Sequence, residues 1–586
     1  MKNGFLFLLL FCTVQALAQA PPIQWQKSLG GSGADVAYSI AQTTDGGYIV
    51  AGQSNSNDIE VSGNHGGYDY WVVKLDDTGG IQWQKSLGGS SDDEAYSIQQ
   101  TLDGGYIVAG FTLSNDGEVS GNNGVYDYWV VKLDDTGAIE WQKALGGSTN
   151  DYAYSIQQTM DSGYIVGGFS SSNDSEVSGN HGDYDYWVVK LNDTGAIKWQ
   201  KSLGGNLDEY AYSIQQTADS GYIVAGMSMS NTGDVSGNHG NQDYWIVKLN
   251  DTGTLQWQKS LGGSNVEFAQ SARQTTDGGY IVAGYSTSND DEVSGNHGST
   301  DYWVVKLDDT GAIRWQKCLG GGGYDAAWAI QQTSDGGYIV AGYSNSSDGD
   351  VSGNHGDYDY WVVRLNDTGA IQWQKSLGGS GLDKAFCIRQ TSDGGYVVAG
   401  TSISNNGDVS GNNGGPDFWV VKLGCSANAG SISGDSIVCA GSSVTLTDIS
   451  TGGVWSVSNH HATISGGIIT GLTPGIDTAI YTVTNACGTA ITTFRFSIAT
   501  TPCPTVLNQL PLATPITIVP NPTTGYISIT GITNVNIKVY NTIGQLIKEA
   551  SNTDNVSITE FPARLYFVRV FNDQGSLIKQ DKIIKG

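Results

Sequence analysis

The sequence is poor in basic residues, in proline and in methionine. Its 586 residues include 28 Lys and Arg against 57 Asp and Glu, which gives a formal net charge of −29. Nucleic acids and anionic membranes bind basic surfaces, so this composition predicts that the chain binds neither. Only 11 residues are Pro and 4 are Met, whereas 82 are Gly. No Gly-X-Y triplet period accompanies the glycines, which excludes a collagen-like rod.

Long apolar runs are also lacking, except at the N-terminus. There, Lys2 precedes an apolar run at positions 5–14 and the small-x-small triplet Ala16-Leu17-Ala18. This pattern predicts a secretory signal peptide over residues 1–18. The run is too short for a hydrocarbon core of about 30 Å, so no membrane span is expected. The mature chain should therefore leave the cytoplasm, and its thiols should meet an oxidising compartment.

A 58-residue repeat dominates the rest of the sequence. Two tryptophan series each recur seven times at a constant step of 58. The first series is Trp25, Trp83, Trp141, Trp199, Trp257, Trp315 and Trp373; the second is Trp71, Trp129, Trp187, Trp245, Trp303, Trp361 and Trp419. A period of this length indicates a solenoid or a propeller. Since apolar residues make up 39% of the chain, the repeats can bury cores.

Each repeat contains four segments that look like strands. In the first repeat they are IQWQKSL (23–29), VAYSIAQ (36–42), YIVAGQS (48–54) and DYWVVKL (69–75). They are short, rich in β-branched and aromatic residues, and bounded by Gly, Asp and Ser. Asp-Gly and Gly-Gly supply the positive φ angles that tight hairpins need. Four antiparallel strands repeated seven times predict an all-β fold with a seven-bladed β-propeller over residues 19–424.

The phase of the blades follows from the connection lengths. The turns TTDGG and DDTGG are too short to lead from an outer strand to the next inner strand, whereas LGGSGAD (29–35) is long enough. Segment 36–42 is therefore expected to be the innermost strand, with small Ala37 and Ser39 on the channel wall. Segment 23–29 then has no blade of its own. We predict that it pairs with 417–423 and closes the ring.

The repeats carry the patterns W-x-K-x-L-G-G, T-x-D-G-G-Y-I-V-A-G and D-Y-W-V-V-K-L. These resemble the bacterial β-propeller repeat families of secreted proteins. The resemblance covers about 400 residues. It implies a propeller scaffold and brings no catalytic residues with it.

Three recurrent series in the repeat, two of tryptophan and one of histidine, are candidates for binding. The tryptophans are expected to pack between blades rather than to stack on sugars, because alternation within strands places them on a packed face. A histidine recurs in an S-G-N-H-G loop, at His65, His181, His239, His297 and His355, and is replaced by Asn123 and Asn413 in repeats two and seven. Because His and Asn both tolerate left-handed backbone, a turn role is favoured over a metal or catalytic role.

Carboxylates are the most regular feature of the loops. The series that begin at Asp35, Glu60 and Asp69 are acidic in all seven repeats, and the phase places them on one side of the disc. Loops such as NDGEVSGN (115–122) could hold calcium, which takes about six to eight oxygen ligands. The candidate ligands are Asp58, Glu60, Asp69, Asp116, Glu118, Asp127 and their equivalents in the other repeats. The alternative is that these side chains cap loops and stay solvated. No other cofactor is expected.

The sequence contains no Ser-His-Asp set, no H-E-x-x-H motif and no phosphate-binding loop, so no catalytic residues are expected. A single site would lie where the repeats differ, for which the candidates are Phe268, Tyr324, Trp328 and Lys384. Cys318 and Cys387 replace Ser in blades too far apart to bond, and both are expected to be free and buried.

The segment 425–505 alternates like a β-sandwich and resembles bacterial immunoglobulin-like modules. It holds four cysteines, and an even number in an exported segment favours disulfides. Four cysteines permit three connectivities. The first expected pair is Cys439–Cys487, and the second is Cys425–Cys503.

The C-terminal segment 506–586 has a different character. It contains PNPTTG, VYNTIGQ, YFVRV and a terminal KIIK, and it resembles the type A C-terminal sorting domain of the Bacteroidetes type IX secretion system. The matching residues are Pro520, Asn521, Pro522, Gly525, Gly544, Tyr566 and Lys585. The resemblance implies a second small β-sandwich, the secretion machinery as partner, and passage through the periplasm to the outer surface or the medium. Arg564-Leu565 departs from the family, which usually has Gly before the Tyr.

The leading interpretation is a monomeric, non-enzymatic binding or scaffold protein at the cell surface or outside the cell, with a glycan or a surface protein as its possible ligand. The alternatives are a carbohydrate-binding or adhesion protein that uses the loop face, and a polysaccharide-active enzyme. One scaffold hosts many functions, so the fold does not separate them.

Overall fold

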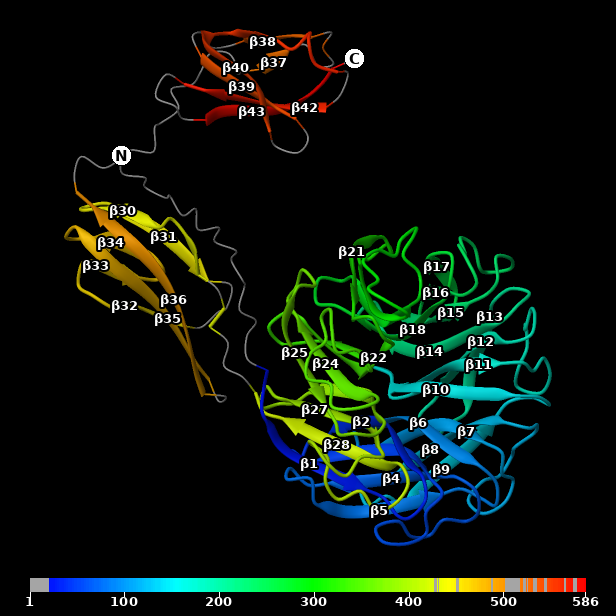
Figure 1. Cartoon of the computed structure of the whole chain (residues 1–586). Helices are drawn as coiled ribbons and strands as arrows, with labels where there is room; N and C mark the ends of the chain where they lie inside the picture. The colour runs from blue at the N-terminus through cyan, green and yellow to red at the C-terminus, as the bar shows by residue number, and fades with distance from the viewer. Residues whose placement is uncertain are drawn as a thin grey trace. The chain divides into compact units, whose positions relative to one another are not determined.

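The computed structural model describes residues 20–425, 429–430, 432–448, 453–485, 488–500, 517–519, 523, 525–530, 535–541, 545–562, 565–572 and 577–585. The predicted signal peptide lies outside these residues. Every regular element in the described part is a β-strand, as Figure 1 shows. The chain divides into two compact units, one with the propeller and the other with most of the C-terminal strands.

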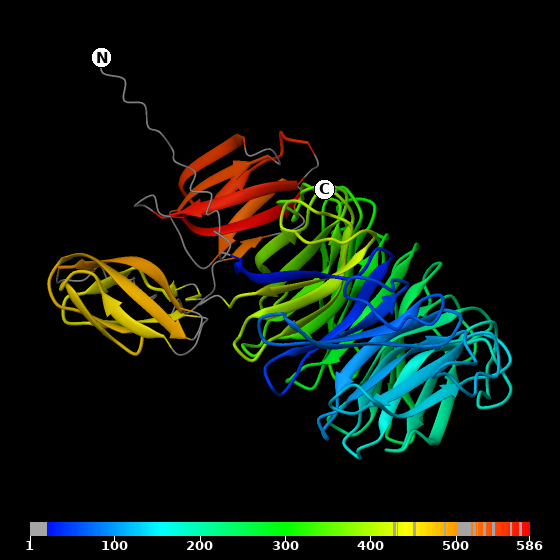
Figure 2. The ribbon, with the colours of Figure 1, turned by 90° about the horizontal axis from the view of Figure 1, so that it is seen from below.

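The propeller consists of seven four-stranded antiparallel sheets around a central axis (Figures 1 and 2). The innermost strands are β2 (Asp35–Gln42), β6 (Asp93–Gln100), β10 (Asp151–Gln158), β14 (Glu209–Gln216), β18 (Glu267–Gln274), β22 (Asp325–Gln332) and β26 (Asp383–Gln390). The second strands are β3 (Tyr48–Ser54), β7 (Tyr106–Thr112), β11 (Tyr164–Ser170), β15 (Tyr222–Ser228), β19 (Tyr280–Ser286), β23 (Tyr338–Ser344) and β27 (Tyr396–Ser402). The third strands are β4 (Asp69–Leu75), β8 (Asp127–Leu133), β12 (Asp185–Leu191), β16 (Asp243–Leu249), β20 (Asp301–Leu307), β24 (Asp359–Leu365) and β28 (Asp417–Leu423). The outer strands are β5 (Ile81–Leu87), β9 (Ile139–Leu145), β13 (Ile197–Leu203), β17 (Leu255–Leu261), β21 (Ile313–Leu319), β25 (Ile371–Leu377) and β1 (Ile23–Leu29).

The two ends of the repeat region share one blade. β1 pairs antiparallel with β28, with Ile23 opposite Leu423 and Leu29 opposite Phe418. The seventh sheet therefore has the order β1-β28-β27-β26. This is the closure expected from the strand phase, and it leaves no blade incomplete.

The tight turns have the geometry that their sequences require. In DDTGG, Asp76 Oδ1 accepts hydrogen bonds from the backbone N–H groups of Thr78 and Gly80, both at 2.8 Å, and Gly79 has a φ of +79°. Such side-chain to backbone bonds fix short turns. The outer strand that follows this turn therefore pairs antiparallel with the third strand of the same blade, as β5 does with β4.

The core lies between neighbouring blades. Trp129 of the second blade is fully buried, and its ring packs 4.5 Å from that of Tyr70 in the first blade. Tyr70 also donates a hydrogen bond from its hydroxyl to the backbone O of Trp129 at 2.8 Å. The tryptophans of the third strands are all fully buried, whereas those of the outer strands are half-buried apart from Trp373. The packing role expected for tryptophan thus applies most strongly to the third strands.

Cys318 and Cys387 are free and buried, as predicted, and burial raises the pKa of the Cys318 thiol to about 12. The two expected disulfides involve Cys487 and Cys503, which lie outside the described residues. Those pairings stay predictions.

Two further β-sandwiches follow the propeller. In the first, one sheet has the order β29 (Ile432–Gly434), β31 (Ser443–Asp448), β34 (Ile468–Gly471), β33 (Ala462–Ser465), and the other β30 (Ile437–Cys439), β36 (Gly488–Ala499), β35 (Gly475–Asn485), β32 (Val454–Val457). Leu446 and Ile469 of one sheet share a core with Val438 and Phe496 of the other.

The last sandwich has a sheet with the order β37 (Thr517–Val519), β38 (Tyr526–Thr530), β41 (Asn555–Ser557), and another with the order β40 (Leu546–Thr553), β39 (Val535–Tyr540), β42 (Leu565–Phe571), β43 (Leu577–Ile584). Ile527 and Val556 of the first sheet share a core with Ile537 and Val568 of the second. The all-β fold class, with a propeller and C-terminal β domains, is confirmed.

Candidate functional site

The inner strands form the wall of a central channel, and a β-bulge in each strand decides which side chains line it. In β2 the pairing with β3 shifts between Ala37 and Ser39, so Tyr38 is the extra residue. The same shift occurs in the other six inner strands. A bulge re-aims the side chains beside it, and both Tyr38 and Ser39 line the channel. The expectation for Ala37 is wrong, because this residue is buried in the core between blades.

An aromatic tier narrows one end of the channel. Its residues are Tyr38, Tyr96, Tyr154, Tyr212, Trp328 and Phe386, with Gln270 in the remaining blade. Neighbouring rings touch from Tyr212 through Tyr38 to Trp328, with centroid distances of 4.5 Å for Tyr38–Tyr96 and 4.8 Å for Trp328–Phe386, and Gln270 interrupts the circle. The cavity within this tier has a volume of only about 90 Å³. Burial raises the pKa of Tyr154 to about 12, so its phenol stays neutral at physiological pH.

A polar tier follows toward the turns that join the inner and second strands. It consists of Gln99, Gln157, Gln215, Gln331, Arg273 and Arg389, with Ala41 in the first blade. Each of the four glutamines accepts a hydrogen bond on its side-chain O from a backbone N–H of the next blade, at 2.7–3.0 Å. The cavity on this side, called the vestibule below, has a volume of about 680 Å³.

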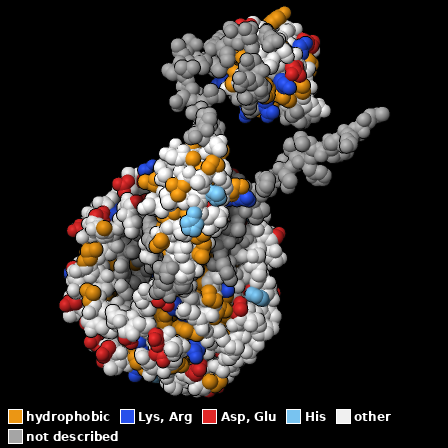
Figure 3. Space-filling model, turned by 90° about the vertical axis from the view of Figure 1, so that its left-hand side faces the viewer, with side chains coloured by type: hydrophobic (Ala, Val, Ile, Leu, Met, Phe, Trp, Pro, Cys, Tyr) orange, Lys and Arg blue, Asp and Glu red, His pale blue; other side chains and the backbone are white. Residues whose placement is uncertain are grey.

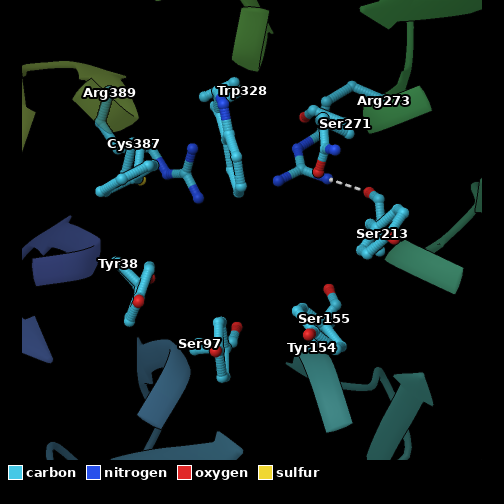
Figure 4. A pocket seen from close by; sticks show the side chains of 16 residues that line it. Tyr38, Ser97, Tyr154, Ser155, Ser213, Ser271, Arg273, Trp328, Cys387 and Arg389 are labelled. Carbon is cyan, nitrogen blue, oxygen red and sulfur yellow. Dashed lines mark hydrogen bonds between the residues drawn. The ribbon is translucent and has the colours of Figure 1, made fainter. Parts of the chain in front are cut away.

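Arg273 and Arg389 extend into the channel, on either side of Trp328 (Figure 4). Arg273 Nη1 donates hydrogen bonds to Ser213 Oγ at 3.2 Å and to Ala272 O at 2.8 Å, and Arg389 Nη1 donates to Ile388 O at 2.9 Å. Burial and the nearby Arg389 lower the pKa of Arg273 to about 10, which still leaves it protonated at neutral pH. Both arginines were missed in the sequence. The available signal was an Arg in a repeat position that is otherwise Gln or Ala.

The sequence suggested a site at four positions where the repeats differ. Of these four residues, only Trp328 lines the channel. Tyr324 and Lys384 lie near one another, because Tyr324 stacks 6.1 Å from Tyr343 and Lys384 Nζ lies 4.7 Å from the centre of the same ring. Burial lowers the pKa of Lys384. Phe268 stacks on a different tyrosine, at a centroid distance of 5.2 Å. That tyrosine, Tyr285, lies 6.2 Å from Tyr324, and Trp328 lies 6.4 Å from Tyr343, so the four residues belong to one cluster of side chains, although only Trp328 among them lines the channel.

The regular carboxylates gather where neighbouring blades meet. Asp69 of the first blade and Asp93 of the second flank Gly88 so closely that a Cβ there would lie 2.8 Å from Asp69 Oδ1 and 2.5 Å from Asp93 Oδ2. Asp69 Oδ2 accepts a hydrogen bond from His65 N at 3.0 Å, and Asp93 Oδ2 accepts one from Gly89 N at 2.8 Å. The Oδ1 atom of each Asp is buried and has no hydrogen-bond partner in the described part of the chain. Burial raises the pKa of Asp93 to about 6.

The calcium candidates bind backbone groups of the loop that enters the inner strand. Asp58 Oδ1 accepts from Ser32 N at 2.8 Å, and Glu60 Oε2 accepts from Gly30 N at 3.0 Å. Equivalent bonds are made by Asp116 and Glu118, and the remaining candidates, Asp69 and Asp127, are buried. Among the residues that the structure describes, no three His, Cys, Asp or Glu side chains are arranged to hold a metal ion. Calcium binding stays a prediction, and a calcium titration followed by thermal unfolding tests it.

The left-handed backbone expected for the recurrent histidine is wrong. His65 does not have a positive φ; Gly63, two residues earlier, has a φ of +89°. His65 Nδ1 instead lies 2.7 Å from Asp69 Oδ2. Four of the other histidines pair in the same way with the first residue of the third strand. Their role is to partner a buried carboxylate, and repeats two and seven lack this partner.

Three sorting-motif residues lie in the described part of the tail, and they converge on one turn. The backbone O of Gly525, which has a φ of +127°, accepts a hydrogen bond from Ile558 N at 2.7 Å. Lys585 Nζ donates to Thr559 O at 3.1 Å, and Tyr566 donates from its hydroxyl to Pro562 O at 2.6 Å. The other motif residues, Pro520, Asn521, Pro522 and Gly544, lie outside the described residues, as does Arg564.

Residues 517–585 match the secretion system C-terminal sorting domain family. No curated protein matches the chain. The similar solved structures include a fungal alcohol oxidase in complex with copper, at 11% identity and a TM-score of 0.41 over 97% of this chain and 100% of that one. The Neurospora crassa Pan2 WD40 domain is similar at 10% identity and a TM-score of 0.37, over 68% of this chain and 95% of that one. The Porphyromonas gingivalis surface component PorZ is similar at 10% identity and a TM-score of 0.23, over 97% of this chain and 86% of that one. Likenesses this distant assign neither a site nor an activity.

The sorting domain indicates secretion, so the protein is located at the cell surface or in the extracellular space. Asp and Glu side chains are spread over the propeller face seen in Figure 3 and are more frequent there than Lys and Arg. Within the described ranges, no helix has the length and apolar character of a membrane span.

Proposed function

We propose that the protein is an exported, non-enzymatic binding protein whose ligand occupies the propeller channel. The observation that carries this proposal is the vestibule, a cavity of about 680 Å³ walled by glutamine and arginine side chains and closed behind by the aromatic tier. Small-molecule sites typically have volumes of about 300–1,000 Å³ and a few well-placed polar groups.

The chemistry of the channel wall supports binding rather than catalysis. None of the described residues that line it is Asp, Glu or His. General acid–base catalysis needs a group with a pKa near the working pH within reach of the substrate. The tyrosines of the wall titrate far above neutrality, as Tyr154 does with a pKa of about 12.

Carbohydrate binding on the loop face is the second candidate. It is favoured by half-exposed tyrosines in the loops, such as Tyr126, whose ring lies 5.0 Å from that of Tyr152, and Tyr184, whose ring lies 5.5 Å from that of Tyr210. Aromatic faces of this kind can stack on sugars.

A glycan array with the mature protein tests both candidates. Binding that is lost when Gln157 and Gln215 are replaced by Leu supports the channel, and binding that is lost with Tyr126→Ala or Tyr184→Ala supports the loop face. Turnover of a bound glycan, detected by release of reducing ends, would contradict the non-enzymatic assignment.

We also propose that the secretion machinery recognises the tail. Deletion of residues 517–585 is expected to abolish export in a bacterium that has the type IX system, because the sorting domain is then missing. Immunoblots of medium, surface and cell fractions measure this result. The propeller does not include these residues, so intrinsic tryptophan fluorescence should show it still folded.

The matched control for the deletion transfers the tail. A periplasmic reporter protein fused to residues 506–586 should reach the surface or the medium. Export of the truncated chain at the level of the full chain would refute the role of the tail.

A further inference from the structure

The two arginines of the polar tier have no acidic partner. In the part of the chain that the structure describes, neither Arg273 nor Arg389 forms an ion pair, and each of their hydrogen bonds goes to a neutral oxygen. This is unusual in a protein with 57 acidic residues and 28 basic ones. Both residues are half-buried, and charges withdrawn from water normally have a partner of opposite charge.

The two guanidinium groups also face the same space, on either side of Trp328 (Figure 4). Like charges in a partly desolvated channel repel each other. An anion between them would remove this repulsion and would receive charge-assisted hydrogen bonds, to which the planar guanidinium is well suited.

The neighbouring glutamines offer further hydrogen-bond donors. The side-chain O of Gln99, Gln157, Gln215 and Gln331 is already bound to a backbone N–H of the next blade. That bond fixes the orientation of each amide, because O and N are distinguished by their partners. The NH₂ groups make no hydrogen bond among the described residues, so the tier presents donors toward the vestibule.

The direction of entry follows from the shape of the channel. The aromatic tier leaves a cavity of only about 90 Å³, whereas the vestibule on the other side of the arginines measures about 680 Å³. A ligand therefore enters from the face that carries the turns between inner and second strands. Its innermost group meets the arginines.

We propose that the channel binds a small acidic ligand, and that Arg273 and Arg389 hold its carboxylate, sulfate or phosphate group while the glutamine amides donate to its remaining oxygens. This inference rests on the proposed function and names the chemical class of the ligand. A uronic acid fits the vestibule as a carboxylate on a hydroxyl-rich ring, and free sulfate is the smallest group of the same chemistry.

The sharpest test replaces both arginines by the residue that other repeats have at this position. R273Q/R389Q should fold, because Gln is accommodated there in four blades. Arg314→Gln is the matched control, since Arg314 is 67% exposed and pairs with Asp308 far from the inner strands. Calorimetry at low ionic strength measures the binding of glucuronate, glucose and sulfate. Thermal unfolding with and without each compound measures how much its binding stabilises the folded protein.

We expect glucuronate to bind the wild type at least about tenfold more tightly than glucose, a difference that charge-assisted hydrogen bonds readily supply. R273Q/R389Q should lose that preference, and R314Q should keep it. Without ligand, the double variant should melt at a higher temperature than the wild type, because the repulsion is gone. Sulfate should raise the melting temperature of the wild type and of R314Q only.

The outcomes separate this inference from the proposed function. Binding of neutral and acidic sugars alike, unchanged in R273Q/R389Q, would overturn the anion site and leave the binding function standing. Stabilisation by sulfate that depends on the arginines, together with turnover of a bound glycan, would support the anion site and overturn the non-enzymatic function. Identical melting curves for the wild type and the double variant, with and without sulfate, would overturn the anion site.

Discussion

Deletion of residues 20–29 is expected to lower the free energy of unfolding of the propeller by more than about 5 kcal/mol, as judged from the usual cost of losing buried side chains and hydrogen bonds. This segment is the outer strand of the seventh blade, so its loss exposes the edge of β28. It removes Leu29, which is 3% exposed, from the core. It also leaves the buried indole of Trp419 without Gln26 Oε1, to which its Nε1 donates at 2.8 Å. Urea unfolding followed by tryptophan fluorescence measures the change.

A circular permutant provides the control for this deletion. In it, the chain begins at residue 30, and residue 423 continues through the DDTGG turn of the first repeat into residues 23–29, as the equivalent turn does in the other repeats. The seventh blade then closes through a local hairpin, so the permutant should be at least as stable as the wild type. If the deleted chain unfolds at the urea concentration of the wild type, β1 does not hold the ring closed.

The fold could be predicted because its determinants are local and repeated. The seven recurrences of tryptophan at a step of 58 indicated seven blades, and the short turns TTDGG and DDTGG indicated which strands pair. The closing pair of β1 and β28 followed from assigning the change of blade to the connection 29–35, because the five-residue turns are too short for it. Each of these inferences needed only spacing and turn chemistry.

The channel could not be predicted in the same way, because its wall depends on a bulge. Strict alternation in β2 would place Ala37 and Ser39 on one face and Tyr38 on the other. The shift in pairing brings Tyr38 and Ser39 to the channel together, and nothing in the sequence VAYSIAQ marks that shift. Arg273 and Arg389 are two repeats apart, and only the closed ring brings their side chains into one space.

Buried carboxylates should make the propeller more stable in mild acid than in mild base. Burial raises the pKa of Asp127 and of Asp417 to about 7, from an ordinary value of 3.8. The folded state therefore keeps protons that the unfolded state has released, and stability falls as the pH rises from about 4 through 7. Asp45 has its pKa lowered to about 2, since bonds from Lys74 and Thr43 outweigh burial, and its contribution is lost only in stronger acid. Guanidinium unfolding at about pH 5 and pH 8 should show the difference.

Asp127 and Asp417 lack a histidine partner, because Asn123 and Asn413 stand where other repeats have His. Substitution of such an Asp therefore tests the effect of burial on the carboxylate. Asn resembles a protonated Asp, so Asp127→Asn should stabilise the propeller by about 2 kcal/mol near pH 8 and by little near pH 5, a cautious fraction of the shift in pKa. Asp185→Asn is the matched control, because Asp185 Oδ2 lies 2.8 Å from His181 Nδ1 and loses this partner on substitution. It should gain less at pH 8 or lose stability. A D127N variant that is less stable than the wild type at pH 8 would mean that this carboxylate is ionised and well solvated, and burial would then not raise the pKa of the carboxylates at the blade junctions.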